Sequence, residues 1–554
     1  MEKFNYPFYN FEKSKADVPF LFQPFGDKWE SWTYGEVGQM ARKLATGLQS
    51  LGLPPKSHIG LVSKNCREWI VADIAIVMAG YVSVPLFPTL SGEQIAQVLD
   101  SGDVKALIAG KMEVWDDMKN GVPADLPLIA MPHYKGNSKI DRGHQWDEFI
   151  NQFEPLETVA ELDMEDIWTI IFTSGTTGTP KGVVHPYRVF HSARIPTDTD
   201  NQLQIDFSGK NRFFSYLPLN HIAERVVVEG SALFFGGEVY FPESLETFAA
   251  NLAYAKPTAF FGVPRIYTKF QQAILAKMPQ KKLDTLLKIP ILNNIVKKKL
   301  RTALGLNEAR IWISGAAPLP EAVKQWYKKI GIKITNGYGM TENCAICTFL
   351  DPDKSKPGSV GHPQAKVQLK IDEETGEILN KSPYVMREYY KEPEKTAETF
   401  KDGWLRTGDQ GYIDEDGDLH ITGRVKDTFK TTKGEFILPS PIEAGFSSNT
   451  DIEQICIAGL GCTQPVALIS ISESGAGKSK ENLSASLEAT LKNVNKDLRN
   501  FEKVSTIIVT KDPWTVENGL VTPTLKVKRG EMNKKFGQKL MNWQESKNKV
   551  VYEA

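Results

Sequence analysis

The 554-residue sequence has few cysteines and no long apolar run. Its five cysteines are odd in number, which is typical of reduced thiols rather than of a disulfide framework. Cys344 and Cys347 form the one CxxC pair, and without a second pair or nearby histidines they make a poor zinc site. The longest apolar run, from Ile74 to Tyr81, is well short of the ~20 residues that a membrane-spanning helix needs. These absences argue against a disulfide-rich scaffold, a zinc protein and a membrane-spanning protein.

Excess charge is absent too, because the formal net charge is only −1. Such a balance gives no general attraction to nucleic acid or to anionic lipid, and no nucleic-acid partner is expected. The first residues lack a basic region followed by an apolar core, so we expect a cytoplasmic protein without a secretory signal. Hydrophobic and charged contents of 41% and 24% are those of a globular protein, and the length predicts two or three domains.

A dense cluster of hydroxyls and glycines follows an apolar stretch at 167–172 that reads as a buried strand. Its residues are Thr173, Ser174, Gly175, Thr176, Thr177, Gly178, Thr179, Pro180, Lys181 and Gly182. Glycines let backbone N–H groups approach an anion, hydroxyls add donors, and Lys181 supplies a positive charge for the distal phosphates. The spacing differs from a Walker A motif, so a different nucleotide chemistry is indicated. The alternative is a Gly/Thr-rich surface turn.

The region from 30 to 110 alternates between helix and strand patterns, which predicts an α/β fold with a parallel sheet. Capping boxes at Thr33 to Glu36 and at Ser91 to Gln94 open two amphipathic helices. Short apolar strands are expected at 58–63, 81–87 and 104–109.

His221 stands where a predicted strand at 213–219 passes into a helix. A histidine at a strand end beside a cleft can contact a substrate carboxylate, although a lone histidine there is more often a capping or core residue. Aromatic residues at 256–267 could line an apolar tunnel, although by themselves they favour an ordinary core.

Two later segments have residues suited to a nucleotide. A strand at 311–314 ends in the small residues Gly315, Ala316 and Ala317, against which a flat ring can lie. A second segment comprises Asn336, Gly337, Tyr338, Gly339, Met340, Thr341 and Glu342. Its ring can stack on adenine, its hydroxyl can bind a phosphate, and its carboxylate can hold Mg²⁺.

The sequence from 355 to 424 is rich in strand and turn signals and predicts a small β-barrel, with a hairpin turn at Asp416-Gly417. Asp409 within it can accept hydrogen bonds from both ribose hydroxyls. From 427 onward new strands and a long charged helix predict a small α+β domain. Lys526, in the basic run near the end, follows a Thr-Pro-Thr turn that would fix its position.

The residues from Lys281 to Leu304 form a strongly basic helical stretch. Such a stretch can lie on an anionic membrane, and it can also be a solvated helix face. The sequence leaves both interpretations open.

The phosphate-binding cluster, followed in order by the segments around His221, Gly315, Tyr338, Asp409, Arg424 and Lys526, resembles the adenylate-forming (AMP-binding) superfamily. Within it, the motifs Tyr-Leu-Pro-Leu-Asn-His-Ile-Ala-Glu-Arg, Gly-Val-Pro-Arg and Val-Thr-Pro-Thr-Leu-Lys look like those of long-chain acyl-CoA synthetases. The resemblance implies a large N-terminal domain (1–425) of two α/β subdomains plus a distorted β-barrel, and a small, mobile α+β C-terminal domain (426–554).

The resemblance also implies a role for each matched residue. Residues 173–181 would hold the ATP phosphates, Gly315 to Ala317 and Tyr338 would frame adenine, and Asn336, Gly337 and Gly339 would complete the nucleotide site. Thr341 and Glu342 would serve the α-phosphate and Mg²⁺, with Thr173 as a second metal ligand. Asp409 would hold ribose, Arg424 would approach ribose and phosphate, and Lys426 would be the hinge. Lys526 would be the adenylation lysine, acting with Lys181 and His221.

The implied activity is ATP-dependent conversion of a long-chain fatty acid to an acyl-AMP and then to an acyl-CoA. ATP, Mg²⁺ and CoA are therefore the expected cofactors and co-substrates. The sequence departs from the family pattern in three places. Val521 stands where leucine or a similar residue is usual, and Glu388 replaces a usual glycine. Lys433-Gly434-Glu435 replaces Gly-Gly-Lys near the approach of the thiol. An acyl-acyl carrier protein synthetase, another carboxylate-adenylating enzyme and a catalytically silent binding protein remain alternatives. The sequence does not decide on a homodimer, or on peripheral contact with the inner face of a membrane.

Overall fold

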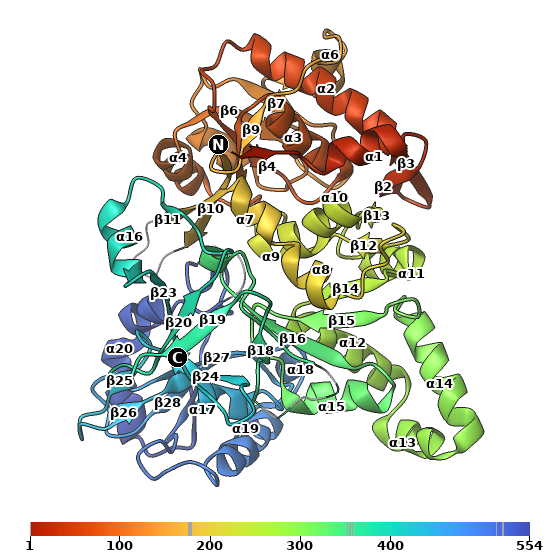
Figure 1. Ribbon diagram of the computed structural model, residues 1–554. Helices are drawn as coiled ribbons and strands as arrows, with labels where there is room; N and C mark the ends of the chain where they lie inside the picture. The colour runs from red at the N-terminus through yellow and green to blue at the C-terminus, as the bar shows by residue number, and fades with distance from the viewer. Residues whose placement is uncertain are drawn as a thin grey trace.

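The computed structural model describes residues 2–174, 180–351, 353, 356, 358–516, 518–522 and 526–553. The chain forms a large N-terminal part, coloured red to green-blue, and a C-terminal part, coloured blue, whose helix α17 (Pro439–Phe446) contacts strand β24 (Leu419–Arg424) (Figure 1). The predicted α/β fold class is confirmed.

The first α/β unit is built on an eight-stranded sheet with the order β21-β11-β10-β5-β4-β6-β7-β8. Its central parallel strands are β4 (His58–Val62), β5 (Val82–Leu86) and β6 (Val104–Ala109), as the sequence predicts. Nearly every residue of these strands is buried, because helices cover both faces of the sheet. At one side β10 (Ile167–Ser174) and β11 (Pro180–Pro186) form an antiparallel pair, which β21 (Glu388–Tyr389) extends.

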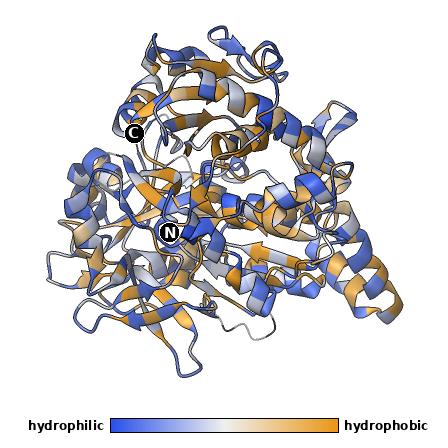
Figure 2. Cartoon of the chain, turned by 45° about the horizontal axis from the view of Figure 1, so that its top comes forward, coloured by the Kyte–Doolittle hydropathy of each residue, from blue (hydrophilic) through white to orange (hydrophobic). Residues whose placement is uncertain are grey.

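The helices of this unit begin where the sequence predicts. The Thr33 hydroxyl accepts from the Glu36 backbone N–H, and the Glu36 carboxylate accepts from the Thr33 N–H, at the start of α2 (Tyr34–Ser50). Ser91 and Gln94 cap α4 (Gly92–Ser101) in the same reciprocal way. Between them in the chain lies α3 (Arg67–Met78), which is buried along its whole length and packs against α2. In Figure 2 the hydrophobic residues concentrate on the strands and on the inner sides of the helices.

The second α/β unit contains three parallel strands, β14 (Ala259–Gly262), β15 (Ile311–Ser314) and β16 (Ile334–Tyr338). Two short antiparallel strands, β17 (Thr348–Phe349) and β18 (His362–Pro363), complete that sheet. The helices of this unit include α12 (Pro264–Lys277), α13 (Gln280–Lys288), α14 (Pro290–Ala303) and α15 (Glu321–Lys329). A further sheet, ordered β12-β13-β2-β3, consists of β12 (Arg212–Phe214), β13 (Glu238–Tyr240), β2 (Pro19–Phe25) and β3 (Lys28–Thr33).

The segment expected to be a barrel is an open antiparallel sheet in the described part of the chain. It consists of β19 (Gln368–Ile371), β20 (Glu377–Lys381), β22 (Phe400–Lys401), β23 (Trp404–Ile413) and β24 (Leu419–Arg424). The strands β22 and β24 pair with opposite ends of β23, and no described pairing joins either of them to β19. The hairpin between β23 and β24 is confirmed, with Gly417 at φ +86° in its turn.

The C-terminal α+β unit has a four-stranded sheet ordered β27-β28-β29-β30 and a core of its own. The strands are β27 (Ile452–Ala458), β28 (Val466–Ile471), β29 (Ile507–Val509) and β30 (Val550–Tyr552). Three helices pack on it, namely α17 (Pro439–Phe446), α19 (Lys480–Val494) and α20 (Arg529–Glu545). Across the residues that the structure describes, no helix combines the length and the hydropathy needed to span a bilayer.

Candidate functional site

Two strands frame the predicted phosphate-binding segment. Thr173, near the end of β10, is paired in register with Lys181 at the start of β11. Residues Gly175, Thr176, Thr177, Gly178 and Thr179, together with the side chain of Ser174, lie outside the described part of the chain. The Lys181 ammonium lies 5.1 Å from the centroid of the Tyr389 ring, and its pKa is lowered chiefly by burial and then by Lys395 and Lys426. Glu342 and Glu392 raise that pKa, so the Lys181 ammonium lies within electrostatic reach of both carboxylates.

The carboxyl ends of β15 and β16 form one wall of the candidate site. Gly315 follows β15, and a Cβ there would lie 3.2 Å from the Gly337 carbonyl oxygen and 3.2 Å from the Phe261 ring. Ala316 has φ +65°, a left-handed conformation that costs a non-glycine residue energy and tends to occur at functional sites. Ala316 and Ala317 are exposed, as a surface that receives a flat ring requires.

The next wall is the segment from Asn336 to Glu342. The Asn336 Oδ1 atom is buried and has no hydrogen-bond partner in the described part of the chain. Gly339 packs against Ala345, whose backbone carbon would lie 2.3 Å from an added Cβ, so only glycine fits. The Tyr338 hydroxyl donates to Asp409 Oδ2 over 2.7 Å. The fold thus brings together a tyrosine and an aspartate that are far apart in the sequence.

Thr341 and Glu342 lie in a short 3₁₀ turn (Thr341–Asn343) after β16. Tyr389 on β21 donates its hydroxyl to Glu342 Oε1 over 2.6 Å. The same tyrosine ring faces Lys181, so Tyr389 connects the phosphate-binding hairpin with the Glu342 carboxylate. Sequence reasoning did not single out Tyr389, because only the pairing of β21 with β11 brings it to the site.

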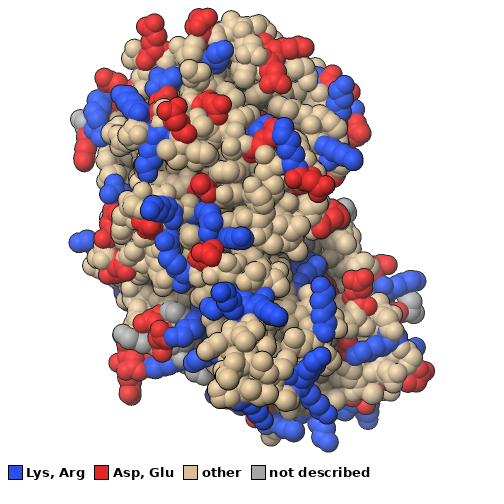
Figure 3. Space-filling view, turned by 90° about the vertical axis from the view of Figure 1, so that its right-hand side faces the viewer, with Lys and Arg blue, Asp and Glu red and all other residues tan. Residues whose placement is uncertain are grey.

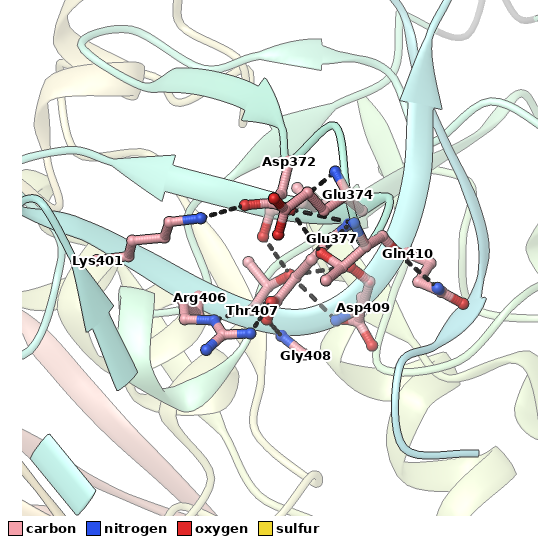
Figure 4. Close-up of polar contacts among 11 residues, drawn as sticks. Asp372, Glu374, Glu377, Lys401, Arg406, Thr407, Gly408, Asp409 and Gln410 are labelled. Atoms are coloured by element: carbon pink, nitrogen blue, oxygen red, sulfur yellow. Dashed lines mark hydrogen bonds and ion pairs between the residues drawn. The ribbon is translucent and has the colours of Figure 1, made fainter. Parts of the chain in front are cut away.

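Asp409 is held in place from both sides. Its Oδ1 accepts from Arg424 Nε over 3.0 Å, while its Oδ2 accepts from Tyr338. Figure 4 shows the supporting contacts, in which Glu377 accepts from the Gly408 backbone N–H at 2.9 Å and from Arg406 at 2.7 Å. Glu377 is another residue that the sequence did not reveal, because a lone glutamate on a strand carries no motif.

His221 is the N-cap of a short helix, α9 (Ile222–Glu224), so the capping interpretation is confirmed. Its Nδ1 accepts from the Ala223 backbone N–H at 3.3 Å, which places the ring proton on Nε2. Burial, followed by the positive charge of Lys526 as a smaller cause, lowers the pKa of His221 to about 4. The ring is therefore neutral near pH 7 and offers Nε2–H as a donor.

Lys526 belongs to the C-terminal unit and reaches the N-terminal one. The Lys526 backbone N–H donates to the Thr522 hydroxyl at 3.1 Å, and the Thr522 N–H donates to the Lys526 carbonyl at 2.8 Å. Lys526 as a whole residue is exposed to solvent. Its ammonium is nevertheless surrounded by protein, and this desolvation lowers its pKa. Arg424 lowers that pKa as well, whereas Asp409 and Glu342 raise it. Lys526 therefore lies within electrostatic reach of the residues that the sequence predicts to bind a nucleotide.

A direct contact also joins the two units, because Arg265 at the start of α12 forms an ion pair with Glu453 on β27. Both side chains are partly exposed, so the pair is screened by salt and contributes modestly to the arrangement.

The described part of the chain contains no group of three or more His, Cys, Asp or Glu side chains that could bind a metal ion by itself. Glu342 is a single carboxylate beside a lysine-bearing hairpin. One carboxylate fits Mg²⁺ that arrives with nucleotide phosphates, because this ion is commonly held by one or two carboxylates, water and phosphate oxygens. Cys344 and Cys347 are buried, and burial raises the pKa of Cys344 to about 12, as expected for structural thiols.

His185 on β11 supports the site from within the core and predicts a pH dependence of stability. Its Nε2–H donates to the Thr341 carbonyl at 2.8 Å, and burial lowers its pKa to about 4. The unfolded chain binds this proton with a pKa near 6.5, so stability falls as the pH drops from about 6.5 to about 4, by about 1.4 kcal/mol per pH unit. We expect His185→Gln, which retains a donor, to flatten that dependence in urea unfolding. The exposed His133, changed to Gln, is the control, and an equal slope in wild type and His185→Gln would contradict the assignment.

The comparison with known proteins covers almost the whole chain. Residues 9–390 match the family described as AMP-binding enzyme, and residues 426–546 match the AMP-binding enzyme C-terminal domain. Long-chain-fatty-acid--CoA ligase 5 of Rattus norvegicus is 31% identical over 590 residues, which cover 95% of this chain and 85% of the relative. Long chain acyl-CoA synthetase 6, peroxisomal, of Arabidopsis thaliana is 29% identical over 578 residues, with 93% and 81% covered.

Solved structures share the fold at lower identity. The anthranilate CoA ligase AuaEII in complex with anthranoyl-AMP superimposes with a TM-score of 0.76 at 21% identity, covering 96% of each chain. The o-succinylbenzoate CoA synthetase MenE from Bacillus subtilis, in complex with its acyl-adenylate, gives a TM-score of 0.75 at 19% identity, covering 96% of this chain and 98% of that one. From its sequence matches and its fold together, the chain belongs to the AMP-binding enzyme family.

Proposed function

We propose that this protein is an AMP-forming long-chain fatty acid–CoA ligase. In the first half-reaction a carboxylate oxygen attacks the α-phosphorus of ATP and pyrophosphate leaves. In the second, the thiol of CoA loses its proton, its sulfur attacks the acyl carbon, and AMP leaves. The observation that carries the proposal is the position of Lys526, a C-terminal lysine that lies within electrostatic reach of Glu342, Asp409 and Arg424 on the N-terminal unit.

The nucleotide would lie across the ends of β15 and β16. The unpartnered Asn336 Oδ1 is an acceptor suited to the amino group of adenine, and the Gly315–Ala317 backbone offers a flat wall. Tyr338 would stack on the base, with Gly337 and Gly339 beside it in the chain. Asp409, fixed by Tyr338 and Arg424, would accept the ribose hydroxyls, and Arg424 would also approach the α-phosphate.

The phosphates would lie between the segment from Thr173 to Lys181 and the turn at Thr341. Lys181 supplies a positive charge to the leaving pyrophosphate, and the Thr341 hydroxyl donates to the α-phosphate. Mg²⁺, held by Glu342 with Thr173, would offset charge that develops on the phosphate oxygens. Preorganised charges of this kind are commonly the largest contribution to such a reaction.

The acyl carboxylate would lie between Lys526 and His221. Because His221 is neutral and donates through Nε2, it can orient the carboxylate without neutralising the nucleophile. The Lys526 ammonium would bridge the carboxylate and the α-phosphate, bringing two anions together. We further propose a domain boundary between residues 425 and 426, with rotation about Lys426 removing Lys526 before the thiol arrives.

The choice of a long-chain acid as substrate and of CoA as acceptor is based on the relatives, which are named as a long-chain acyl-CoA synthetase and a long-chain-fatty-acid–CoA ligase. The alternative acceptor is an acyl carrier protein, because Lys433-Gly434-Glu435 departs from the family pattern. These residues are exposed, and the neighbouring Phe436 is exposed as well, so a protein partner could reach them.

One experiment separates these functions. Pyrophosphate release is measured with short-, medium- and long-chain acids, without a thiol, with CoA and with a phosphopantetheinylated carrier protein. The proposal predicts release that is greatest with long-chain acids, and thioester formation with CoA. Thioester on the carrier protein alone would establish the alternative acceptor, and release with none of the acids would identify a binding protein.

Glu342→Gln should raise the Mg²⁺ concentration needed for half-maximal pyrophosphate release by at least about tenfold, because a neutral amide is a much weaker ligand for this cation. The readout is the rate across a Mg²⁺ titration at saturating ATP. Glu388→Gln is the matched control. Glu388 lies on β21 next to Tyr389, and its carboxylate forms an ion pair with Arg387. Equal Mg²⁺ dependence in Glu342→Gln and wild type would show that Glu342 does not bind Mg²⁺.

A further inference from the structure

The hairpin of α13 and α14 projects from the second α/β unit, at the lower right of Figure 1. Its inner side is anchored, because Leu283 is buried and Leu287, Val296 and Leu300 pack against the core of that unit. Asn293 adds a bond from its Nδ2 to the Leu287 carbonyl at 2.8 Å, which ties the start of α14 to the end of α13. The hairpin is therefore a fixed projection with one face toward the core and another toward solvent.

The tip of this hairpin exposes large apolar side chains. Ile289 is 43% exposed, Ile291 is 78% exposed and Ile295 is 46% exposed, and Pro290 between the helices is exposed too. Ile291 and Ile295 are four residues apart, so they share one face of α14. Single exposed isoleucines are ordinary, whereas three around one turn form a patch that requires an explanation.

Basic side chains border this apolar tip. The exposed face of α14 continues with Lys298 and Lys299, and α13 exposes Lys281, Lys282 and Lys288. Within residues 280–303 there are seven Lys or Arg residues and one acidic residue, Asp284, in a chain whose net charge is −1. Figure 3 faces this side of the molecule and shows Lys and Arg around an area without charged atoms in its lower part. A local excess of positive charge thus lies beside exposed isoleucines.

We propose that the α13–α14 tip docks this protein on an anionic lipid bilayer. Apolar side chains at the tip would enter the boundary between headgroups and acyl chains, and the lysines would contact anionic headgroups. Charge complementarity favours this occupant, because a partner of the same chain would bring seven further positive charges to the face. This inference goes beyond the proposed function, since membrane binding is measured without catalysis. Docking on a bilayer would also place the protein where long-chain acids partition.

The test is co-sedimentation of the purified full-length protein with vesicles of phosphatidylcholine, with or without phosphatidylglycerol. We expect binding to the anionic vesicles that weakens as salt is raised, and little binding to phosphatidylcholine alone. Lys298→Glu with Lys299→Glu should weaken binding at least about tenfold, at about 1 kcal/mol for each lysine near the surface. The double variant Ile291→Asn with Ile295→Asn should also bind the vesicles more weakly. Its remaining binding should still weaken as salt is raised, because the lysines are retained.

The matched control is Lys534→Glu with Lys535→Glu, an equal charge change at exposed positions of α20. This control should retain binding, and pyrophosphate release from a short, soluble acid should be unchanged in every hairpin variant. The proposal is overturned if wild type does not bind anionic vesicles, if the control weakens binding as much as the hairpin pair does, or if both hairpin variants bind like wild type. Concentration-dependent dimerisation that is lost in the isoleucine variant, without vesicle binding, would assign the face to a second copy instead.

Discussion

Lys526→Ala is expected to slow acyl-AMP formation by about 10²–10³-fold, the cost of removing one preorganised charge from a site where negative charge is brought together. Transfer of the acyl group from supplied acyl-AMP to CoA should continue at close to the wild-type rate. The reason for the asymmetry is that Lys526 belongs to the C-terminal unit and would leave the site when that unit turns. Two assays measure the effect, namely pyrophosphate release with fatty acid and ATP, and thioester formation from synthetic acyl-AMP.

Lys528→Ala is the internal control for this prediction. Lys528 lies two residues further along the chain, where it is the N-cap residue of α20 and is not among the side chains that meet at the candidate site. Its backbone N–H, which donates to the Leu520 carbonyl at 2.9 Å, is retained in the variant. Both half-reactions should survive Lys528→Ala. Equal loss of both half-reactions in Lys526→Ala, or loss of adenylation through Lys528, would contradict the assignment and the proposed rotation.

Asp409→Ala is expected to raise the KM for ATP by about a hundredfold or more. Each hydrogen bond to a charged acceptor contributes about 1.5–3 kcal/mol, and the variant loses the acceptor for two ribose hydroxyls. It also releases Tyr338 and Arg424, whose positions depend on the same carboxylate. Initial rates across an ATP titration, at saturating fatty acid, measure the change.

The matched control is Asp416→Ala, in the exposed turn that follows the same strand. It removes one carboxylate from the same sheet and should leave the KM for ATP unchanged. Thermal unfolding of both variants shows whether the sheet is retained. An Asp409→Ala enzyme that is folded and binds ATP as tightly as wild type would make Asp409 a structural residue of β23.

Much of the fold could be predicted because local chemistry and global packing agree. The capping boxes at Thr33 and Ser91 and the apolar runs at 58–63 and 104–109 each specify an element without help from distant residues. The described residues form no closed barrel, so this part of the prediction is not confirmed, and the reason is physical. Strand and turn patterns identify strands, but whether a sheet closes depends on pairing between its first and last strands, which no local pattern encodes.

The candidate site, like the fold, could be predicted only in part from the sequence. Motif residues such as Tyr338 and Asp409 could be named from the sequence, and their hydrogen bond follows only from the fold. Tyr389 and Glu377 were missed, because their contacts join segments that are distant along the chain. The buried network of Arg225 with Asp73 and Glu229 was missed as well, since charged residues are expected at the surface until a partner is seen.

The most direct test of the central claim is exchange of labelled pyrophosphate into ATP, measured with the full-length protein, Mg²⁺ and a long-chain fatty acid. The account predicts exchange that requires the fatty acid, proceeds without CoA and is reduced about 10²–10³-fold in Lys526→Ala. Exchange at the wild-type rate in Lys526→Ala, or its absence with every carboxylic acid tested, would contradict the conclusion that this site forms an acyl-adenylate.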